Sequence, residues 1–476
     1  MTHYISLSIN SEAPVELLNS KADLEAADRR FHFHSQSDPT KLETDGPFTI
    51  ARGQGPYVFD LEGRKYLDAV ASLWCASLGF SDRRLAAAGA AVLETLPVYH
   101  TFNQRSNPYA AELSSLVCGI APLEGARIFF TDGGSEAVDS MVKMAWYYHM
   151  ARGEGSRRKI IARRGAFHGS TVMAARISGL PAMHKSFNLP DCNVVHTARP
   201  HFYRDGLPGE SEAEFVARLS RDLETLIDIE GPETIAAFIA EPVMGAGGVI
   251  TPPEGYLPAM RAIVKKYGIL YLSDEVICGF GRTGNWFGCQ TFGVEPDMMS
   301  IAKGLSSGYA PIGGVVVSGA IFEALSSEAA RNGVFAHGFT YSGHPVSAAI
   351  AVEAMRIYRE MDLPKVATKL GRRLAVRLED LSDHPMVGNV RACGFLAGVE
   401  LMADKARKIP FEPDLKVGAR VERASRARGL IVRNLGDCIA ICPPYVMTEE
   451  EVDMMVDTLA RTLDDAHADI RSQAAA

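Results

Sequence analysis

Cysteine, long apolar runs and excess positive charge are all scarce in this 476-residue chain, and each shortage excludes a class of protein. Eight cysteines, with no CxxC pair and no paired His and Cys ligands, argue against a disulfide framework or a metal site. No apolar stretch approaches the roughly 18 residues of a membrane span. The formal charge of −8 argues against a generic nucleic-acid-binding surface. We therefore expect no metal, no membrane and no nucleic-acid partner.

The first 18 residues hold no Lys or Arg and no long apolar run, which does not fit a secretory signal. Together with the sparse cysteine, this predicts a cytoplasmic protein in a reducing compartment. Apolar residues make up 47% of the chain and charged residues 22%, as in globular proteins. A chain of this length can bury a large hydrophobic core.

From about residue 80, short apolar segments alternate with helical patterns, which is typical of a mostly parallel sheet with helices on both faces. We therefore predict an α/β fold, with a large domain over residues 76–345. Residues 1–75, with a hairpin around Gly63, and residues 346–476 are expected to form a smaller α+β domain. The expected strands of the large domain are Arg127–Thr131, 159–162, 235–241, 269–274, 298–302 and 313–318. A helix over 345–361 leads to further strands at 390–402 and 430–441.

Two charged residues stand at the ends of predicted strands. Asp274 ends the strand 269–274, and the carboxyl ends of parallel strands are where open α/β sheets bind ligands. A buried carboxylate there needs a cation or a strong donor, although a helix cap or an internal salt bridge is the alternative. Lys303 directly follows the strand 298–302. Partial burial would lower its pKa and free the amine for nucleophilic chemistry, whereas the alternative is a surface lysine with a buried stem.

A glycine turn lies between a predicted strand and a predicted helix in IFFTDGGSEA at 128–137. Free backbone N–H groups and the helix dipole make such a turn a phosphate site, here at Gly134 and Ser135. An ordinary helix start, capped by Asp132 or Ser135, is the alternative. A second glycine motif, GFGRTG at 279–284, lacks the following helix and the correctly spaced acid of a dinucleotide site.

A phosphate turn, a lysine nucleophile and a buried acid at strand ends are together what pyridoxal phosphate requires. The lysine forms a Schiff base with this cofactor. The acid pairs with the pyridine nitrogen and keeps it protonated, so that the ring can accept electrons. The combination of the three signals therefore predicts a pyridoxal phosphate enzyme.

With these motifs in place, the chain resembles the class III, omega-type aminotransferases of the fold type I pyridoxal phosphate superfamily. The resemblance covers about residues 30–460 and implies the large and small domains described above. It rests on motifs in the family's order: SLWC at 72–75, GSEA at 134–137, FHGST at 167–171, EP at 241–242, SDEV at 273–276, KG at 303–304 and HGFTYSGHP at 337–345.

By this resemblance, Lys303 is the catalytic residue, which forms the Schiff base and shuttles the proton. Phe167 and Val276 would cover the two faces of the cofactor ring, and Thr340 would reach the phosphate from the other subunit. The full set of implied cofactor residues is Gly134, Ser135, Phe167, His168, Glu241, Asp274, Val276, Lys303 and Thr340. The implied substrate residues are Trp74, Phe102, Ala246 and Arg433, with Phe102 supplied by the partner subunit and Arg433 gripping a carboxylate.

The chain departs from the family's pattern at two places. Asp132 and Gly133 stand where many relatives carry Asn and Ser, so a carboxylate replaces an amide beside the expected phosphate and a hydroxyl is lost. Phe167 stands where many relatives carry Tyr, which keeps the ring stacking and loses the phenol hydrogen bond.

The resemblance implies a ping-pong aminotransferase that moves an amino group from an omega-amino acid or another primary amine to an oxo acid, with pyruvate the first expectation. Omega-amino acids, taurine-like sulfonates, diamines and aryl-alkyl amines all stay open as donors. The family also implies a homodimer, or a dimer of dimers. An amino-group mutase or racemase on the same scaffold is the alternative.

Overall fold

The computed structural model describes residues 20–191 and 193–475, and this part of the chain divides into two compact units. The expectation about a secretory signal concerns residues outside the described range. The first unit holds the described residues up to Gly53 together with residues 58–65. It contains α1 (Lys21–Phe31), α2 (Pro39–Asp45) and most of β1 (Ile50–Gln54) and β2 (Tyr57–Asp60). Both helices begin at a side-chain cap, because Ser20 accepts from the Asp23 N–H and Asp38 from the Thr40 N–H.

The second unit is built around a seven-stranded sheet in the order β4-β10-β9-β8-β7-β5-β6. Strand β10 pairs antiparallel with both of its neighbours, and the run from β9 to β6 is parallel. The predicted α/β class with a mostly parallel sheet is therefore confirmed. The strands are β4 (Arg127–Thr131), β5 (Lys159–Arg163), β6 (Val194–Thr197), β7 (Ile235–Ala240), β8 (Leu270–Asp274), β9 (Met298–Ile301) and β10 (Gly313–Val317).

Six of these strands match the expected segments, and β6 was missed. Its sequence, VVHT, is four residues long and half polar, so it gives little periodic signal. Every residue of β7 and β8 is buried, and β7 is apolar throughout, as expected for a sheet covered on both faces.

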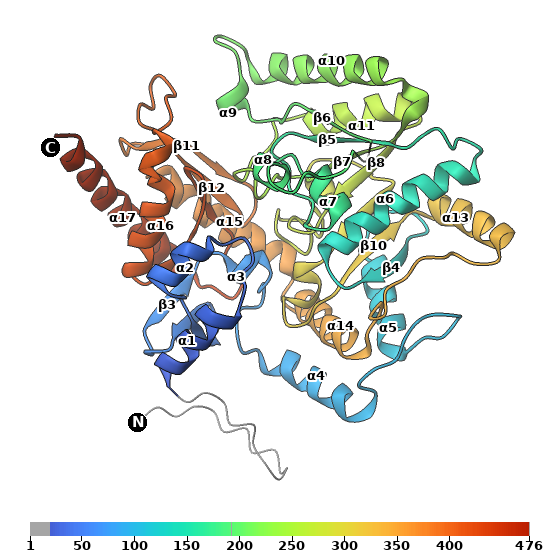
Figure 1. Cartoon of the computed structure of the whole chain (residues 1–476), viewed down its shortest axis with the longest axis horizontal. Helices are drawn as coiled ribbons and strands as arrows, with labels where there is room; N and C mark the ends of the chain where they lie inside the picture. The colour runs from blue at the N-terminus through green and yellow to red at the C-terminus, as the bar shows by residue number, and fades with distance from the viewer. Residues whose placement is uncertain (1–19, 192, 476) are drawn as a thin grey trace. The chain divides into compact units, whose positions relative to one another are not determined.

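Helices cover both faces of this sheet (Figure 1). On one face, α6 (Gly134–Ala151) and α13 (Gly319–Asn332) pack against alternate strand residues such as Ile160 and Leu272. On the other, α10 (Glu212–Glu230) and α11 (Tyr256–Lys266) pack against residues such as Ile161, Phe238 and Tyr271. This alternation follows from the two-residue period of a strand. Shorter helices lie in the connections: α7 (Val172–Ile177), α8 (Pro181–His184), α9 (Phe202–Asp205), η1 (Pro232–Thr234) and α12 (Gly288–Thr291).

The C-terminal part of the chain forms an antiparallel sheet in the order β11-β12-β15-β14. The segment 390–402, expected as one strand, is instead two antiparallel strands, because the turn between them places Gly394 at φ 56°. The segment 430–441 divides in the same way into three short strands. The strands are β11 (Val387–Ala392), β12 (Ala397–Leu401), β13 (Leu430–Ile431), β14 (Arg433–Leu435) and β15 (Cys438–Ile441).

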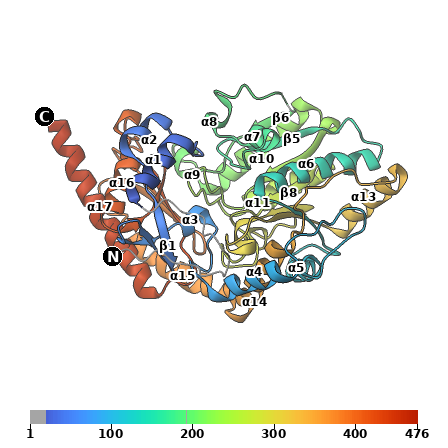
Figure 2. The same ribbon diagram turned by 60° about the horizontal axis from the view of Figure 1, so that its bottom comes forward.

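Helices α15 (Leu363–Glu379) and α16 (Val417–Ala427) both pack against the long α17 (Glu449–Ala475), as Figure 2 shows. Strand β13 pairs in parallel with the last residues of β3 (Lys65–Asp68), which joins the region after residue 66 to the C-terminal part. The remaining elements are α3 (Ala71–Trp74), α4 (Arg83–Thr95), α5 (Pro108–Cys118) and η3 (Pro413–Leu415). The domain boundaries expected near residues 75 and 345 stay a prediction.

Helix α14 (Pro345–Glu360), expected at 345–361, packs against η2 (Lys303–Ser306), the turn that follows β9. The buried Tyr358 hydroxyl donates a 2.6 Å hydrogen bond to the Gly304 carbonyl oxygen. This contact fixes the backbone directly after Lys303. None of the described helices combines the length and the apolar content that a membrane crossing requires.

Candidate active site

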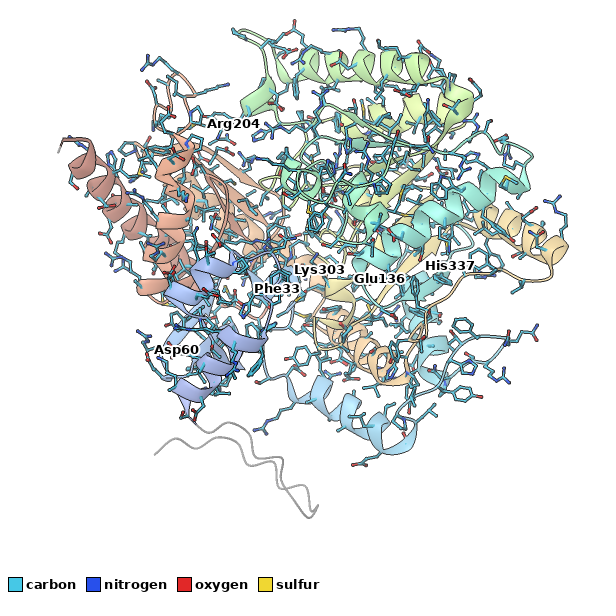
Figure 3. All side chains as sticks on the ribbon, in the orientation of Figure 1. Phe33, Asp60, Glu136, Arg204, Lys303 and His337 are labelled. Atoms are coloured by element: carbon cyan, nitrogen blue, oxygen red, sulfur yellow. The ribbon has the colours of Figure 1, made fainter. Side chains whose placement is uncertain are left out.

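A cavity of about 340 Å³ lies at the carboxyl ends of the central strands. Figure 3 shows Lys303 in the middle of the second unit, with Glu136 of the first turn of α6 to one side of it. The structure brings together nearly all of the predicted cofactor residues, and only Thr340 is missing from the lining. The predicted residues that line the cavity are Gly134, Ser135, Phe167, His168, Glu241, Asp274, Val276 and Lys303.

Asp274 is the last residue of β8, and its carboxylate is held from three sides. Its Oδ2 lies 2.7 Å from His168 Nδ1. Its Oδ1 accepts hydrogen bonds from the Ser300 hydroxyl at 3.0 Å and the Val276 N–H at 3.2 Å. Ser300 stands directly opposite Asp274 in the β8–β9 register. These contacts orient the carboxylate toward the cavity. The alternative of an internal salt bridge is met only by the imidazole of His168, because no Lys or Arg among the described residues pairs with Asp274.

Ser300 is a site residue that the sequence analysis missed. The available signal was a lone hydroxyl within the buried, otherwise apolar strand MMSI. His168 was expected only as a cofactor residue, and the structure also makes it the direct partner of Asp274. Its other ring nitrogen, Nε2, is buried and has no hydrogen-bond partner among the described residues.

Lys303 comes one residue after Ala302, which follows the end of β9, and it lines the cavity, so the alternative of a surface lysine is wrong. Burial lowers the pKa of its ammonium, while the nearby carboxylate of Asp274 raises it by a smaller amount. The backbone of Lys303 has φ 42°, a conformation that side-chain-bearing residues rarely adopt and that concentrates at functional sites. The strand end and this sharp turn together place the amine over the strand edge near Asp274.

The glycine turn before α6 is open to a ligand. The N-cap of α6 is Gly133, and no side chain caps the helix, so the alternative of a cap by Asp132 or Ser135 is wrong. The Ser135 hydroxyl instead accepts the Ser170 N–H at 3.0 Å. A Cβ on Gly134 would lie 3.1 Å from Val276 Cγ1, so the glycine lets the turn approach the cavity closely. The uncapped N–H groups are available to an anion.

Asp132 faces this same cavity rather than turning away from it. Its Oδ1 is buried without a hydrogen-bond partner among the described residues. Burial and, to a smaller extent, the neighbouring Glu136 raise the pKa of the Asp132 carboxyl. The departure from the family's Asn therefore places a titratable group beside the helix N-terminus.

Glu241 ties together two loops that border the cavity. Its Oε1 accepts the Phe167 N–H at 3.1 Å and its Oε2 accepts the Gly245 N–H at 2.9 Å. Burial raises the pKa of this carboxyl, which is 3% exposed. The buried Arg163 donates to the Glu241 carbonyl oxygen at 2.6 Å, so this arginine holds the main chain of Glu241 and not its carboxylate.

Trp74 and Arg433 lie together, as the resemblance implied for the substrate side. The Arg433 guanidinium carbon is 5.2 Å from the centroid of the Trp74 ring, a cation–π distance. Burial lowers the pKa of Arg433. The Trp74 indole Nε1 is buried without a partner among the described residues. Ala246 lines a neighbouring cavity and not the one at Lys303, although the adjacent Gly245 lies against Trp74.

The loop that carries Trp74 is strained and is held by one carboxylate. Ala71, Ser72 and Trp74 all have positive φ, at 46°, 60° and 63°. The buried Asp68 carboxylate accepts the Val70 N–H at 2.8 Å and the Ser72 N–H at 2.7 Å. Burial raises the pKa of Asp68 to about 6, partly offset by these bonds. The carboxylate therefore supports a backbone conformation that is unfavourable by itself.

Phe102 and Thr340 come together in another place. Phe102 is 42% exposed and lines a separate cavity of about 520 Å³ with His337 and Gly338. The Thr101 hydroxyl donates to the Ser342 carbonyl oxygen at 3.1 Å, which joins the two segments. Phe102 thus lies beside the segment 337–342, which contains Thr340, and neither Phe102 nor Thr340 lines the Lys303 cavity.

Comparison with known proteins agrees with this geometry. The family model described as aminotransferase class-III matches residues 40–463. The chain belongs to the class III aminotransferases. The chloroplastic gamma aminobutyrate transaminase 3 of Solanum lycopersicum is 45% identical to this aminotransferase over 454 residues, which cover 94% of this chain and 87% of that protein.

Solved transaminase structures share the fold of this aminotransferase. The omega transaminase of Pseudomonas jessenii, in complex with PMP, is 43% identical with a TM-score of 0.92, over 93% of this chain and 98% of that one. A transaminase described as bound to L-ala is 44% identical with a TM-score of 0.88, over 94% and 99% of the two chains. The aminotransferase therefore has the pyridoxal phosphate fold type I and transaminates amines and oxo acids with this cofactor. These transaminase relatives favour transamination over the mutase or racemase alternative.

The cavity of the aminotransferase fits pyridoxal phosphate. Its volume is in the range of small-molecule sites. The uncapped turn at Gly134 and Ser135 suits the phosphate, and the fixed Asp274 carboxylate suits the pyridine N–H. Lys303 would hold the aldehyde carbon, with Phe167 and Val276 beside the ring.

One group of possible metal ligands occurs in the described part of the aminotransferase, at Asp28, His32 and His34, whose donor atoms lie within 4.8 Å of one another. Both imidazoles hydrogen-bond to the Asp28 carboxylate, at 2.9 and 2.7 Å. These bonds account for the grouping without an ion. That the reaction needs no metal stays a prediction.

The Asp132→Asn variant should bind pyridoxal phosphate more tightly than the wild type, by about three- to tenfold at pH 8, because it removes a negative charge beside the phosphate turn. The difference should shrink toward pH 5, since the raised pKa lets Asp132 take up a proton there. Titration of apoenzyme, followed by cofactor absorbance, measures both effects. The exposed Asp228→Asn of α10 is the control, and equal affinity of all three proteins would contradict the prediction.

The Asp68→Asn variant should flatten the pH dependence of stability between about pH 4 and 6. The folded-state pKa of Asp68, about 6, lies above its ordinary value of 3.8, so its contribution to stability is greatest at low pH and is lost as the pH rises through 6. The wild type should lose up to about 3 kcal/mol more than the variant over this interval. Urea unfolding at pH 4.5 and 7.5 measures this difference, and parallel curves for the two proteins would refute it.

Proposed function

We propose that this class III aminotransferase moves the amino group of an omega-amino acid to pyruvate. The observation that carries the proposal is the Arg433 guanidinium, which lies on the Trp74 ring with no hydrogen bond or ion pair to a described residue. A partly buried, unpaired guanidinium is a strong receptor for a carboxylate. Both an omega-amino acid and pyruvate carry such a group.

The names of the relatives support both substrates. The tomato relative is named for gamma aminobutyrate, an omega-amino acid. The transaminase structure with L-ala holds the amino acid that forms when pyruvate receives an amino group. Phe167, in the place of the family's Tyr, gives the donor an apolar neighbour.

When bound, pyridoxal phosphate supplies a reactive aldehyde carbon and a ring that accepts an electron pair. Lys303 holds that carbon between turnovers, and its free amine then carries the proton between the substrate carbon and the cofactor. Asp274 keeps the pyridine nitrogen protonated, while His168 and Ser300 hold the Asp274 carboxylate in place. Arg433 binds the substrate carboxylate in each half-reaction, first of the donor and then of the acceptor.

We further propose a homodimer in which Phe102 and Thr340 complete the partner's site. Support comes from the position of Phe102 beside the segment 337–342, since neither Phe102 nor Thr340 lines the Lys303 cavity of its own chain. Thr340 is exposed in the described chain, and its hydroxyl is free to bind a phosphate outside it.

The half-reactions should be visible in the absorbance spectrum. Purified holoenzyme should show a yellow band that bleaches with gamma-aminobutyrate or β-alanine and returns with pyruvate. The Lys303→Ala variant should lack the normal band and retain less than about a thousandth of the turnover, because Lys303 is the one lysine among the described residues that line the cavity. A band that bleaches but does not return with pyruvate would overturn the proposed acceptor. A band that never bleaches would overturn the donor.

The shared site can be tested with mixed subunits. Lys303→Ala and Thr340→Val dimers should each be weakly active, and co-expression should restore about a quarter of the wild-type activity. This fraction follows because half of the dimers are mixed and each contains one intact site. If Thr340 served its own subunit, no mixed dimer would contain an intact site and activity would stay low.

A further inference from the structure

A second cavity, of about 680 Å³, lies beside the active site and is lined by arginines. Three segments far apart in the chain contribute a guanidinium each: Arg164 after β5, Arg199 after β6 and Arg218 of α10. A single carboxylate, that of Asp205, is part of the lining. The active-site chemistry described above uses none of these residues.

Two of these arginines are held in place by carboxylates, and the third is not. Arg199 Nε donates to Asp205 Oδ2 at 2.7 Å, and Arg218 Nε donates to Glu210 Oε1 at 2.8 Å. Arg164 is exposed and makes no hydrogen bond or ion pair to a described residue. The cavity therefore offers an unpaired guanidinium beside two fixed ones.

The surroundings add further positive charge. Arg204, labelled in Figure 3, immediately precedes Asp205. It shares the carboxylate of Glu400 with Arg391, so that two more arginines are balanced by one acid. Taken together, five arginines in this region face three carboxylates, namely Arg164, Arg199, Arg204, Arg218 and Arg391 against Asp205, Glu210 and Glu400.

One loop separates this cavity from the substrate residues. Ala246 and Gly247 line the cavity, while a Cβ on Gly245 would lie 2.6 Å from the Trp74 ring. Leu435, which also lines the cavity, comes two residues after Arg433 on β14. The cavity is thus walled by the strand that carries Arg433 and by the loop that packs against Trp74.

We propose that this arginine-lined cavity is a vestibule that receives the carboxylate of the oxo acid before it reaches Arg433. This inference rests on the proposed function for the identity of the acid. The excess positive charge raises the local concentration of small anions and repels cationic amines. Arg164 is the residue that contacts the incoming carboxylate, because its guanidinium is not engaged by the protein.

The Arg164→Gln variant tests whether the cavity distinguishes anionic from zwitterionic substrates. Enzyme in its pyridoxamine form is mixed with pyruvate, and enzyme in its pyridoxal form with zwitterionic β-alanine. The variant should lower the second-order rate constant for pyruvate about three- to fivefold at low salt, and this loss should fade at about 0.3 M salt. The rate constant for β-alanine should change less than twofold. The exposed Arg372→Gln of α15 removes the same charge elsewhere and should leave both rate constants near the wild-type values.

A second readout requires no turnover. Acetate at low ionic strength should protect Arg164 of the holoenzyme against phenylglyoxal, measured residue by residue in peptides, and should leave Arg372 unprotected. Three outcomes would each overturn the vestibule. In the first, Arg164→Gln lowers the rate constants for pyruvate and β-alanine equally; in the second, Arg372→Gln lowers the rate constant for pyruvate as much as Arg164→Gln does. In the third, phenylglyoxal modifies Arg164 at the same rate with and without acetate. A wild-type enzyme that does not react with pyruvate would instead overturn the proposed acceptor, and the protection experiment would still decide the vestibule.

Discussion

The rest of the site depends on a buried carboxylate at the end of β8. Asp274 is 4% exposed, yet it faces a cavity rather than the core, and every contact it makes within the protein is with a neutral donor or an imidazole. A buried carboxylate is costly unless its oxygens are satisfied. The β8–β9 register places Ser300 against one oxygen, and the loop after β5 places His168 against the other. The parallel sheet thus fixes the orientation of the Asp274 carboxylate.

The residues at strand ends were predictable from the sequence, because each follows a short apolar segment of the kind that is typical of a buried strand. Asp274, Lys303 and the turn at Gly134 lie where their local patterns put them. The identity of the cofactor followed from the three together, and the family's motifs supplied the remaining lining residues. Strand ends meet at one edge of a parallel sheet, so local patterns were enough to predict one common site.

The features that could not be predicted from the sequence depend on the register between paired strands and on contacts between chain segments far apart. The bond from Ser300 to Asp274 requires the pairing of β8 with β9, and the mixed composition of β6 hid a strand. The sequence could not show whether the N-terminus of α6 is uncapped or capped, because Asp132 and Ser135 are both good capping residues. The arginine-lined cavity collects residues from three connections and has no local motif. The sequence shows a glycine at position 394, but it does not show that this residue adopts the left-handed backbone conformation that divides one expected strand into two.

Glu241 gives this architecture a consequence for how the substrate pocket can vary. Its two oxygens bind the backbone at Phe167, on the cofactor side, and at Gly245, on the substrate side. A Cβ on Gly245 would lie 2.4 Å from Ile277 Cδ1 and 2.6 Å from the Trp74 ring, so any side chain there displaces the pocket wall. Because the Glu241 carboxylate binds both backbones, a displacement at Gly245 would also move Phe167. A change at Gly245 would therefore alter the substrate side and the cofactor side together, so that the two cannot vary independently at this position.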